Sequence, residues 1–188
     1  MKLRTLLIAT SVVAMTACAT GSNGTNYVES KPALKNSSNP FIATNYKAAD
    51  ALIEQLSDKL NPGQPMIVAT IVNIDDLNNS STFGRTVSEQ VSARFSQATY
   101  NMIEMKFRGY VFMKQDQGEL LLTREIRDVA KNHNAQGVIV GTYSLSNNSV
   151  YVNLKVIQPN TNVVLAGHDY AFPMDSDVKV MTKAIIRR

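Results

Sequence analysis

MIVATIVNIDDLNNSSTFGRTVSEQVSARF, residues 66–95, has the clearest pattern of secondary structure in the chain. Its first nine residues, 66–74, are a nearly unbroken apolar run of strand length, which predicts a strand covered on both faces. A polar loop, 75–81, separates this run from a segment in which large apolar residues recur one helical turn apart. The positions expected to be buried in that helix are Phe83, Val87, Val91, Phe95 and Ala98. The stretch is therefore predicted to fold as strand, loop and helix.

The segments on either side extend the same alternation of helices and strands. Apolar steps of three and four predict a first helix that begins at Asn39-Pro40 and ends at Asn61-Pro62-Gly63. The further expected elements are a strand at 101–106, a helix near 122–133, strands at 137–143, 149–157 and 162–170, and a short helix at 178–186. We therefore predict one domain over residues 40–188, an α/β sandwich with a mixed sheet and the order α-β-α-β-α-β-β-β, which ends in an antiparallel meander.

The first 17 residues have the pattern of a signal peptide. Lys2 and Arg4 make a cationic start, and residues 6–17 are an apolar core of the length that secretory signals use. The core is too short to span a bilayer, because a spanning helix needs about 20 apolar residues. Small side chains precede Cys18, where a signal peptidase needs them. The predicted signal peptide is therefore residues 1–17, and Cys18 becomes the first mature residue.

Residues 15–18, Met-Thr-Ala-Cys, resemble a bacterial lipobox, although Met15 stands where that motif usually has leucine. The resemblance implies that Cys18 carries fatty acyl chains, such as palmitate, on its sulfur and its amine. Three chains exceed the two membrane signals that stable anchoring requires. Ala19 and Thr20 lack the aspartate that resembles an inner-membrane retention signal, so we expect a lipid-anchored protein of the outer membrane, on either face of it. The alternative is a plain secretory signal with an incidental cysteine.

Residues 18–39 are expected to be the lipid anchor and a flexible tether. The segment is rich in Ser, Thr, Asn and Gly, and it cannot bury enough apolar surface to offset the entropy of ordering it. A flexible chain of about 20 residues has a root-mean-square reach of about 25 Å. The folded domain should therefore stay near the membrane.

Charge and cysteine content exclude several functions. Removal of Lys2 and Arg4 from the 19 basic residues leaves 17 against 15 acidic residues, a net charge of +2. That balance gives no reason to expect a nucleic-acid partner. Cys18 is the single cysteine of the chain, so no disulfide forms within it.

The sequence predicts no catalytic, cofactor-binding or metal site. His133 lies at the end of a predicted helix, where a histidine complements the helix dipole. His168 precedes Asp169, but adjacent strand residues point to opposite faces, so Asp169 is badly placed to orient His168. A triad drawn from distant residues has no support, because the sequence has no nucleophile-elbow motif. Asp75-Asp76 could bind a cation or serve as paired acids, and the preferred role is to shape a polar loop after a strand. The chain is therefore expected not to be an enzyme.

One segment has the composition of a partner contact. Aromatic, Met and Arg side chains, which interface cores favour, gather at Phe107, Arg108, Tyr110, Phe112 and Met113. The alternative is that this segment packs on its own domain as a short edge strand. The basic face made by Arg124, Arg127 and Lys131 could meet anionic lipid or polysaccharide, and a solvated face is preferred. The tail 180–186 could dock on a neighbouring subunit or, as we prefer, cover its own sheet.

The stretch 66–95, together with AQGVIVGTYSLSNNSVYVNLKVIQPNTNVVLAG at 135–167, is similar to the shared plan of the CsgG, TolB amino-terminal and FlgO domains. That plan is a strand, an N-x-D loop, a G-R-x-x-x-E-x-x-x-x-x-F helix, a G-x-x-x-x-G-x-Y strand and a hairpin. The similarity covers about residues 41–172. The length, the lipobox and the segments TVSEQVSARF and GVIVGTY most resemble the FlgO family of outer-membrane proteins associated with bacterial flagella.

That resemblance implies a structural or assembly component that supports the flagellum and motility. The partners it implies are other envelope or flagellar proteins, with further copies of the chain among them. Two alternatives stay open. A lipoprotein regulator of a peptidoglycan synthase would have to reach the cell-wall layer on a short tether. A CsgG-like secretion-complex subunit ranks third, because its membrane hairpins would need strands of about 9–11 alternating residues for which no segment has room.

Overall fold

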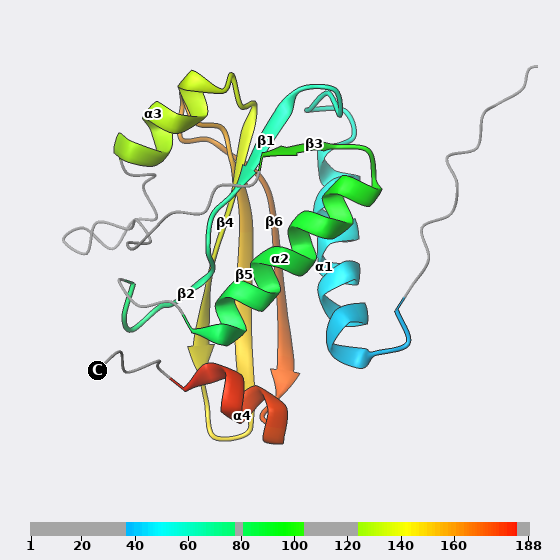
Figure 1. Ribbon diagram of the computed structural model, residues 1–188, viewed down its shortest axis with the longest axis vertical. Helices are drawn as coiled ribbons and strands as arrows, with labels where there is room; N and C mark the ends of the chain where they lie inside the picture. The colour runs from blue at the N-terminus through cyan, green and yellow to red at the C-terminus, as the bar shows by residue number, and fades with distance from the viewer. Residues whose placement is uncertain (1–36, 78–80, 104–123, 184–188) are drawn as a thin grey trace, which may run out of the picture. The chain divides into compact units, whose positions relative to one another are not determined.

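The computed structural model describes residues 37–77, 81–103 and 124–183. The elements within them are α1 (Pro40–Leu56), β1 (Pro65–Val68), β2 (Val72–Asn73), α2 (Thr82–Gln97), β3 (Asn101–Ile103), α3 (Arg124–Asn132), β4 (Gly137–Leu145), β5 (Ser149–Ile157), β6 (Val164–Pro173) and α4 (Ser176–Thr182) (Figure 1). They form one mixed sheet with helices packed on it, so the predicted fold class is confirmed.

The strands lie in the order β3-β1-β4-β5-β6, and β2 also pairs with β4. The pairs of β1 with β3, of β1 with β4 and of β2 with β4 are parallel. The pairs of β4 with β5 and of β5 with β6 are antiparallel. The last three strands therefore form the predicted meander, and β6 is an edge of the sheet.

Helices cover the two faces of this sheet unequally. α1, α2 and α4 pack on one face, where the largest buried side chains are Leu52, Leu56, Met66, Phe83, Phe95, Ile139 and Leu154 (Figure 1). α3 packs on the other face, where the cluster is Ile67, Ala69, Ile126, Ala130, Val138, Val140 and Ile157. Both faces of β1 are thus buried, as its unbroken apolar run predicts. All five positions predicted to be buried in α2 are buried.

The prediction of one continuous strand over 66–74 is wrong, because β1 and β2 are separated by an irregular segment. Val68 pairs with Ile139, and Val72 pairs with Thr142. Four residues on the first strand therefore span three on β4, which is the one-residue excess of a β-bulge. A run of apolar residues shows no sign of such a bulge.

Helix α2 supplies the hydrogen bonds that the bulge lacks. The Ser88 hydroxyl accepts from the Ile71 N–H at 2.9 Å, and its single proton lies between two acceptors, the Gly84 carbonyl oxygen at 2.9 Å and the Ala69 carbonyl oxygen at 3.2 Å. The helix can approach this closely because residue 84 is glycine. A Cβ atom at Gly84 would lie 1.8 Å from the Ile71 carbonyl oxygen.

The ends of four other elements also bear on the prediction. α1 begins at its predicted start, where the Asn39 side chain accepts from Phe41 N–H and Ile42 N–H, and it ends at Leu56, ahead of the expected stop. β3 is described only to Ile103, because the rest of the predicted strand lies outside the described residues. β6 runs to Pro173, and α4 begins two residues early because the Asp175 side chain caps it.

Two side chains cover part of the outer edge of β6: Gln55, at the C-terminal end of α1, and Lys59, which follows the helix. The Gln55 amide donates to the Gly167 carbonyl oxygen at 3.0 Å, and the Gly167 N–H donates to Gln55 Oε1 at 3.2 Å. Beyond the helix, Lys59 Nζ donates to the Leu165 carbonyl oxygen at 2.6 Å. These bonds occupy main-chain groups that another strand would otherwise use.

A partly buried ion pair joins α1 to α2. Arg94 is 3% exposed, and its Nε and Nη2 atoms both donate to the carboxylate of Asp50, each at 2.7 Å. The guanidinium also lies 5.0 Å from the centre of the Tyr46 ring. The hydrogen bond to Asp50 raises the pKa of Arg94, so the arginine stays charged throughout the ordinary pH range.

A second polar contact ties β6 to both helices. The Tyr170 hydroxyl donates to Asn45 Oδ1 at 2.5 Å, and Asn45 Nδ2 donates to Gln90 Oε1 at 2.6 Å. Asn45 is fully buried. Burial raises the pKa of Tyr170 well above its ordinary value of 10.0, so the phenol is held neutral.

This raised pKa predicts a loss of stability in alkali. The contribution of Tyr170 is fully present below the pKa of unfolded tyrosine, about 10, and is lost as the pH rises toward the folded pKa. We expect the free energy of unfolding to fall above pH 10 by up to about 1.4 kcal/mol per pH unit for this group. Urea titrations between pH 8 and pH 11 measure it. Tyr170→Phe should flatten the decline, whereas Tyr151→Phe, at an exposed tyrosine, should leave it unchanged; equal slopes in all three proteins would contradict the assignment.

Candidate functional site

One face of the sheet is open at the end away from α3. Residues that alternate along β5 face outward there, and the register fixes their neighbours: Tyr151 lies between Ser144 and Ala171, and Asn153 lies between Thr142 and Asp169. The next rows of the same face carry Val140 and Val138, which α3 covers. We define the open-face site as Ile74, Thr142, Ser144, Tyr151, Asn153 and Asp169.

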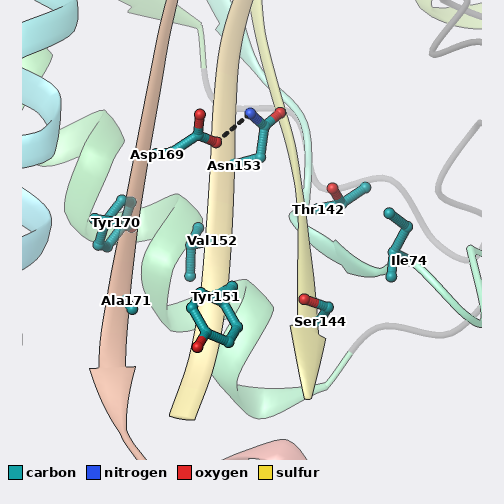
Figure 2. Close-up of a pocket in the computed structure, with 9 residues that line it drawn as sticks. All are labelled: Ile74, Thr142, Ser144, Tyr151, Val152, Asn153, Asp169, Tyr170 and Ala171. Carbon is teal, nitrogen blue, oxygen red and sulfur yellow. Dashed lines mark hydrogen bonds between the residues drawn. The ribbon is translucent and has the colours of Figure 1, made fainter. Parts of the chain in front are cut away.

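These side chains line an open depression of about 440 Å³ (Figure 2). Val152 and Tyr170 also border it, but strand alternation places their side chains on the opposite, helix-covered face. The depression therefore has a floor of three neighbouring strands, β4, β5 and β6. The residue after β2, Ile74, flanks it on the β4 side (Figure 2).

The site combines apolar surface with neutral polar groups. Tyr151 and Ile74 are 55% and 54% exposed, which is high for side chains of their size. Asn153 Nδ2 donates to Asp169 Oδ1 at 2.5 Å, so the two side chains hold one another in place. The Ser144 hydroxyl can donate and accept, whereas Thr142 is only 4% exposed and forms part of the floor of the site. Asp169 is the single formal charge among the six residues, so the site is suited to binding through hydrogen bonds and apolar contact.

The residues predicted to carry function from the sequence lie elsewhere. Cys18, the predicted lipid-attachment residue, is outside the described residues. So is the predicted partner contact, Phe107, Arg108, Tyr110, Phe112 and Met113. Both therefore stay predictions.

His168 and Asp169 face opposite sides of the sheet, as predicted. In the register, His168 is paired with Leu154 and Asp169 with Asn153. The His168 ring instead stacks near Tyr170, with the ring centres 6.0 Å apart. His133 is exposed and follows the end of α3. Over the residues that the structure describes, no three His, Cys, Asp or Glu side chains come together as a metal site would require.

Asp75 and Asp76 lie in a tight turn directly after β2. The Asp75 N–H donates to the Asn73 side chain at 3.0 Å, and the Asp76 N–H donates to the Asn73 carbonyl oxygen at 3.2 Å. The preferred prediction, a polar loop shaped after a strand, is confirmed for this turn.

The motif residues that dominate the sequence pattern are used to pack the helix against the sheet. The Tyr143 hydroxyl donates to Ser81 Oγ at 2.7 Å, and Ser81 in turn caps α2 by accepting from the Gly84 N–H at 3.1 Å. A Cβ atom at Gly141 would lie 2.6 Å from the Asn153 carbonyl oxygen. These residues therefore define the fold rather than a ligand site.

The open-face site was not predicted from the sequence. The alternation in 149–157 marks Tyr151 and Asn153 as outward-facing, and this is the signal that was available. Ile74, Thr142 and Asp169 come from three other segments. They join the site through the strand register, which a single sequence does not show.

The fold places the chain in the class of single α/β domains with a mixed sheet, one helix-covered face and one partly open face. The family model described as FlgO protein matches residues 46–177, and the chain belongs to the FlgO family. A search of curated proteins finds no relative of this chain. In the parts of the chain that the structure describes, no helix combines the length and apolar character needed to cross a membrane.

Several solved structures resemble this chain at low sequence identity, and the one with a TM-score of 0.50 shares its fold. The C-terminal domain of LpoB from Escherichia coli is 12% identical, with a TM-score of 0.50 over 71% of this chain and 98% of that domain. The same domain from Salmonella enterica is 15% identical, with a TM-score of 0.48 over 66% and 94%. A PelC dodecamer from Paraburkholderia phytofirmans is 14% identical, with a TM-score of 0.41 over 65% and 83%. At these identities the likeness shows the fold alone.

Proposed function

We propose that this chain is a lipid-anchored outer-membrane protein that supports the flagellum as a structural or assembly component, without catalysing a reaction. The observation that carries the proposal is membership of the FlgO family across residues 46–177. The signal-like start and the lipobox that ends at Cys18 support the anchor.

The chemistry of the described residues agrees with a binding or assembly role. The histidines and paired aspartates that could have suggested catalysis are in a helix end, a ring stack and a turn. Partners of this protein would be the outer membrane, through its acyl chains, and other envelope or flagellar proteins, with further copies of the chain among them. We keep Phe107, Arg108, Tyr110, Phe112 and Met113 as the proposed contact with such partners.

Loss of the anchor should abolish function. A Cys18→Ala strain is expected to lose labelling by a palmitate analogue and to release the protein from the outer-membrane fraction, because the acyl chains provide the membrane affinity. Swimming in soft agar should fall to the level of a deletion strain, with fewer or unstable flagella by electron microscopy. Growth and resistance to wall-active antibiotics should stay normal. Ser22→Ala, a change in the adjoining predicted tether, is the matched control and should behave as wild type.

The same strains separate the alternatives. Normal swimming with lysis or antibiotic sensitivity would reject the flagellar role and favour a regulator of a peptidoglycan synthase. The shared fold with the LpoB domain of Escherichia coli is the observation in favour of that second candidate. A defect in secretion with normal swimming and a sound wall would favour a CsgG-like subunit, which we rank third.

A further inference from the structure

The sheet face that carries the open-face site changes from apolar to polar where α3 ends. The rows that α3 covers carry Val138, Val140 and Ile157, and the rows beyond it carry Thr142, Ser144, Asn153 and Asp169. If another protein normally covered these outer rows, we would expect them to be apolar like the rows under α3, because interface cores are depleted in charged residues. This surface is instead suited to a polar ligand that also offers some apolar area.

The charge of the site restricts the ligand further. Its one formal charge is the carboxylate of Asp169, and Asp75 and Asp76 follow Ile74 directly in the chain. Phosphate, sulfate and anionic lipid headgroups would be repelled at such a site. The nearest cationic side chain on the same strand face is Lys155, one row away from Asn153 and opposite Gly167. Anionic ligands are therefore disfavoured.

The remaining groups match the chemistry of a sugar. A pyranose has an apolar C–H face and a rim of hydroxyls that both donate and accept hydrogen bonds. Tyr151 offers an exposed ring with a hydroxyl at its end, which is the amphipathic surface that such a ring can lie on. Asp169 accepts only, while the hydroxyl of Ser144 both donates and accepts.

The open-face site is also preorganised for binding. All of the polar side chains stand on neighbouring strands of one sheet, and the Asn153–Asp169 hydrogen bond fixes two of them (Figure 2). Little ordering would then accompany binding, which preserves affinity for a small ligand. A volume of about 440 Å³ falls within the range of small-ligand sites. We propose that the open-face site binds an uncharged glycan, with one sugar ring over Tyr151 and its hydroxyls hydrogen-bonded to Asn153 and Asp169.

The test is titration of the isotope-labelled full chain in detergent micelles with two neutral tetrasaccharides, maltotetraose and the tetramer of N-acetylglucosamine. We expect amide resonances of β4, β5 and β6 near Thr142, Tyr151 and Asp169 to shift with at least one of them. The sugar that binds distinguishes a plain glucan from an N-acetylated glycan as the source. Tyr151→Ala should weaken binding at least about tenfold, because the stacking surface is lost.

Two further variants keep the test decisive. Asp169→Asn retains the shape of the side chain and should weaken binding while leaving the unfolding temperature unchanged. Val180→Ala removes a comparably exposed apolar side chain, 67% exposed on α4, and should have no effect on binding. Absence of shifts with both sugars, or equal weakening by Val180→Ala, would overturn the proposal. So would a concentration-dependent dimer in sedimentation that Tyr151→Ala abolishes, since the occupant would then be a second copy. The assay does not involve motility, so its outcome is independent of the flagellar role.

Discussion

Gly84→Ala is expected to destabilise the domain by about 3 kcal/mol or more, at the upper end of what overpacking costs. The added Cβ atom would lie 1.8 Å from the Ile71 carbonyl oxygen, which is backbone and has no side-chain torsion through which to move away. Helix α2 would have to withdraw from the bulge, and the hydrogen bonds of Ser88 would be lost with it. Urea denaturation followed by circular dichroism measures the change.

Gly167→Ala is the matched control for this substitution. Its nearest added contact would be the Leu154 carbonyl oxygen at 3.8 Å, an ordinary van der Waals distance. The variant should stay within about 0.5 kcal/mol of the parent, as exposed substitutions usually do. Equal stability of the two variants would show that α2 does not approach the bulge as closely as described.

The second large effect is expected from Asp50→Ala, which removes the carboxylate partner of Arg94. The arginine is 3% exposed, whereas the Asp50 side chain is 41% exposed, so water partly compensates the loss. Breaking a fully buried pair costs about 3–5 kcal/mol, and we expect about 2–3 kcal/mol here. Urea denaturation at pH 7 is the measurement.

A control and a double variant separate charge burial from packing. Glu54→Ala, at an exposed position of the same helix, should be nearly neutral. Asp50→Leu combined with Arg94→Met removes both charges and should recover part of the stability that Asp50→Ala loses. A double variant less stable than Asp50→Ala would mean that the pair contributes mainly through shape and contacts with Tyr46.

Sequence periodicity predicted the elements whose surroundings are uniform along their length. The apolar run that became β1 is buried on both faces, and the apolar residues predicted to be buried in and directly after α2 are buried, whereas the burial of Gly84, Ser88 and Arg94 was not predicted. The alternation in β5 likewise reported one covered and one open face. In each case a local pattern carries the information, because burial repeats with the period of the element.

The features that were missed depend on contacts between distant segments. The bulge between β1 and β2 depends on two residues more than ten positions further along the chain: Ser88 bonds its main chain, and Gly84 lets α2 approach it closely. The open-face site exists because the register brings Thr142, Asn153 and Asp169 into one row. The anchor prediction rests on Cys18, which was identified from the lipobox motif. Labelling with a palmitate analogue tests whether this residue is acylated.

The side chains that occupy the β6 edge have a consequence if the protein is attached to a surface, as we propose. Anchored copies meet one another in two dimensions, at a local concentration far above that of the same number of molecules in solution. An exposed strand edge would then act as a seed for lateral sheet growth from copy to copy. With Gln55 and Lys59 bonded to the main chain at Gly167 and Leu165, that stretch of the edge is closed to polymerisation. Crowding of this chain on a membrane should therefore not lead to strand pairing through this stretch of β6.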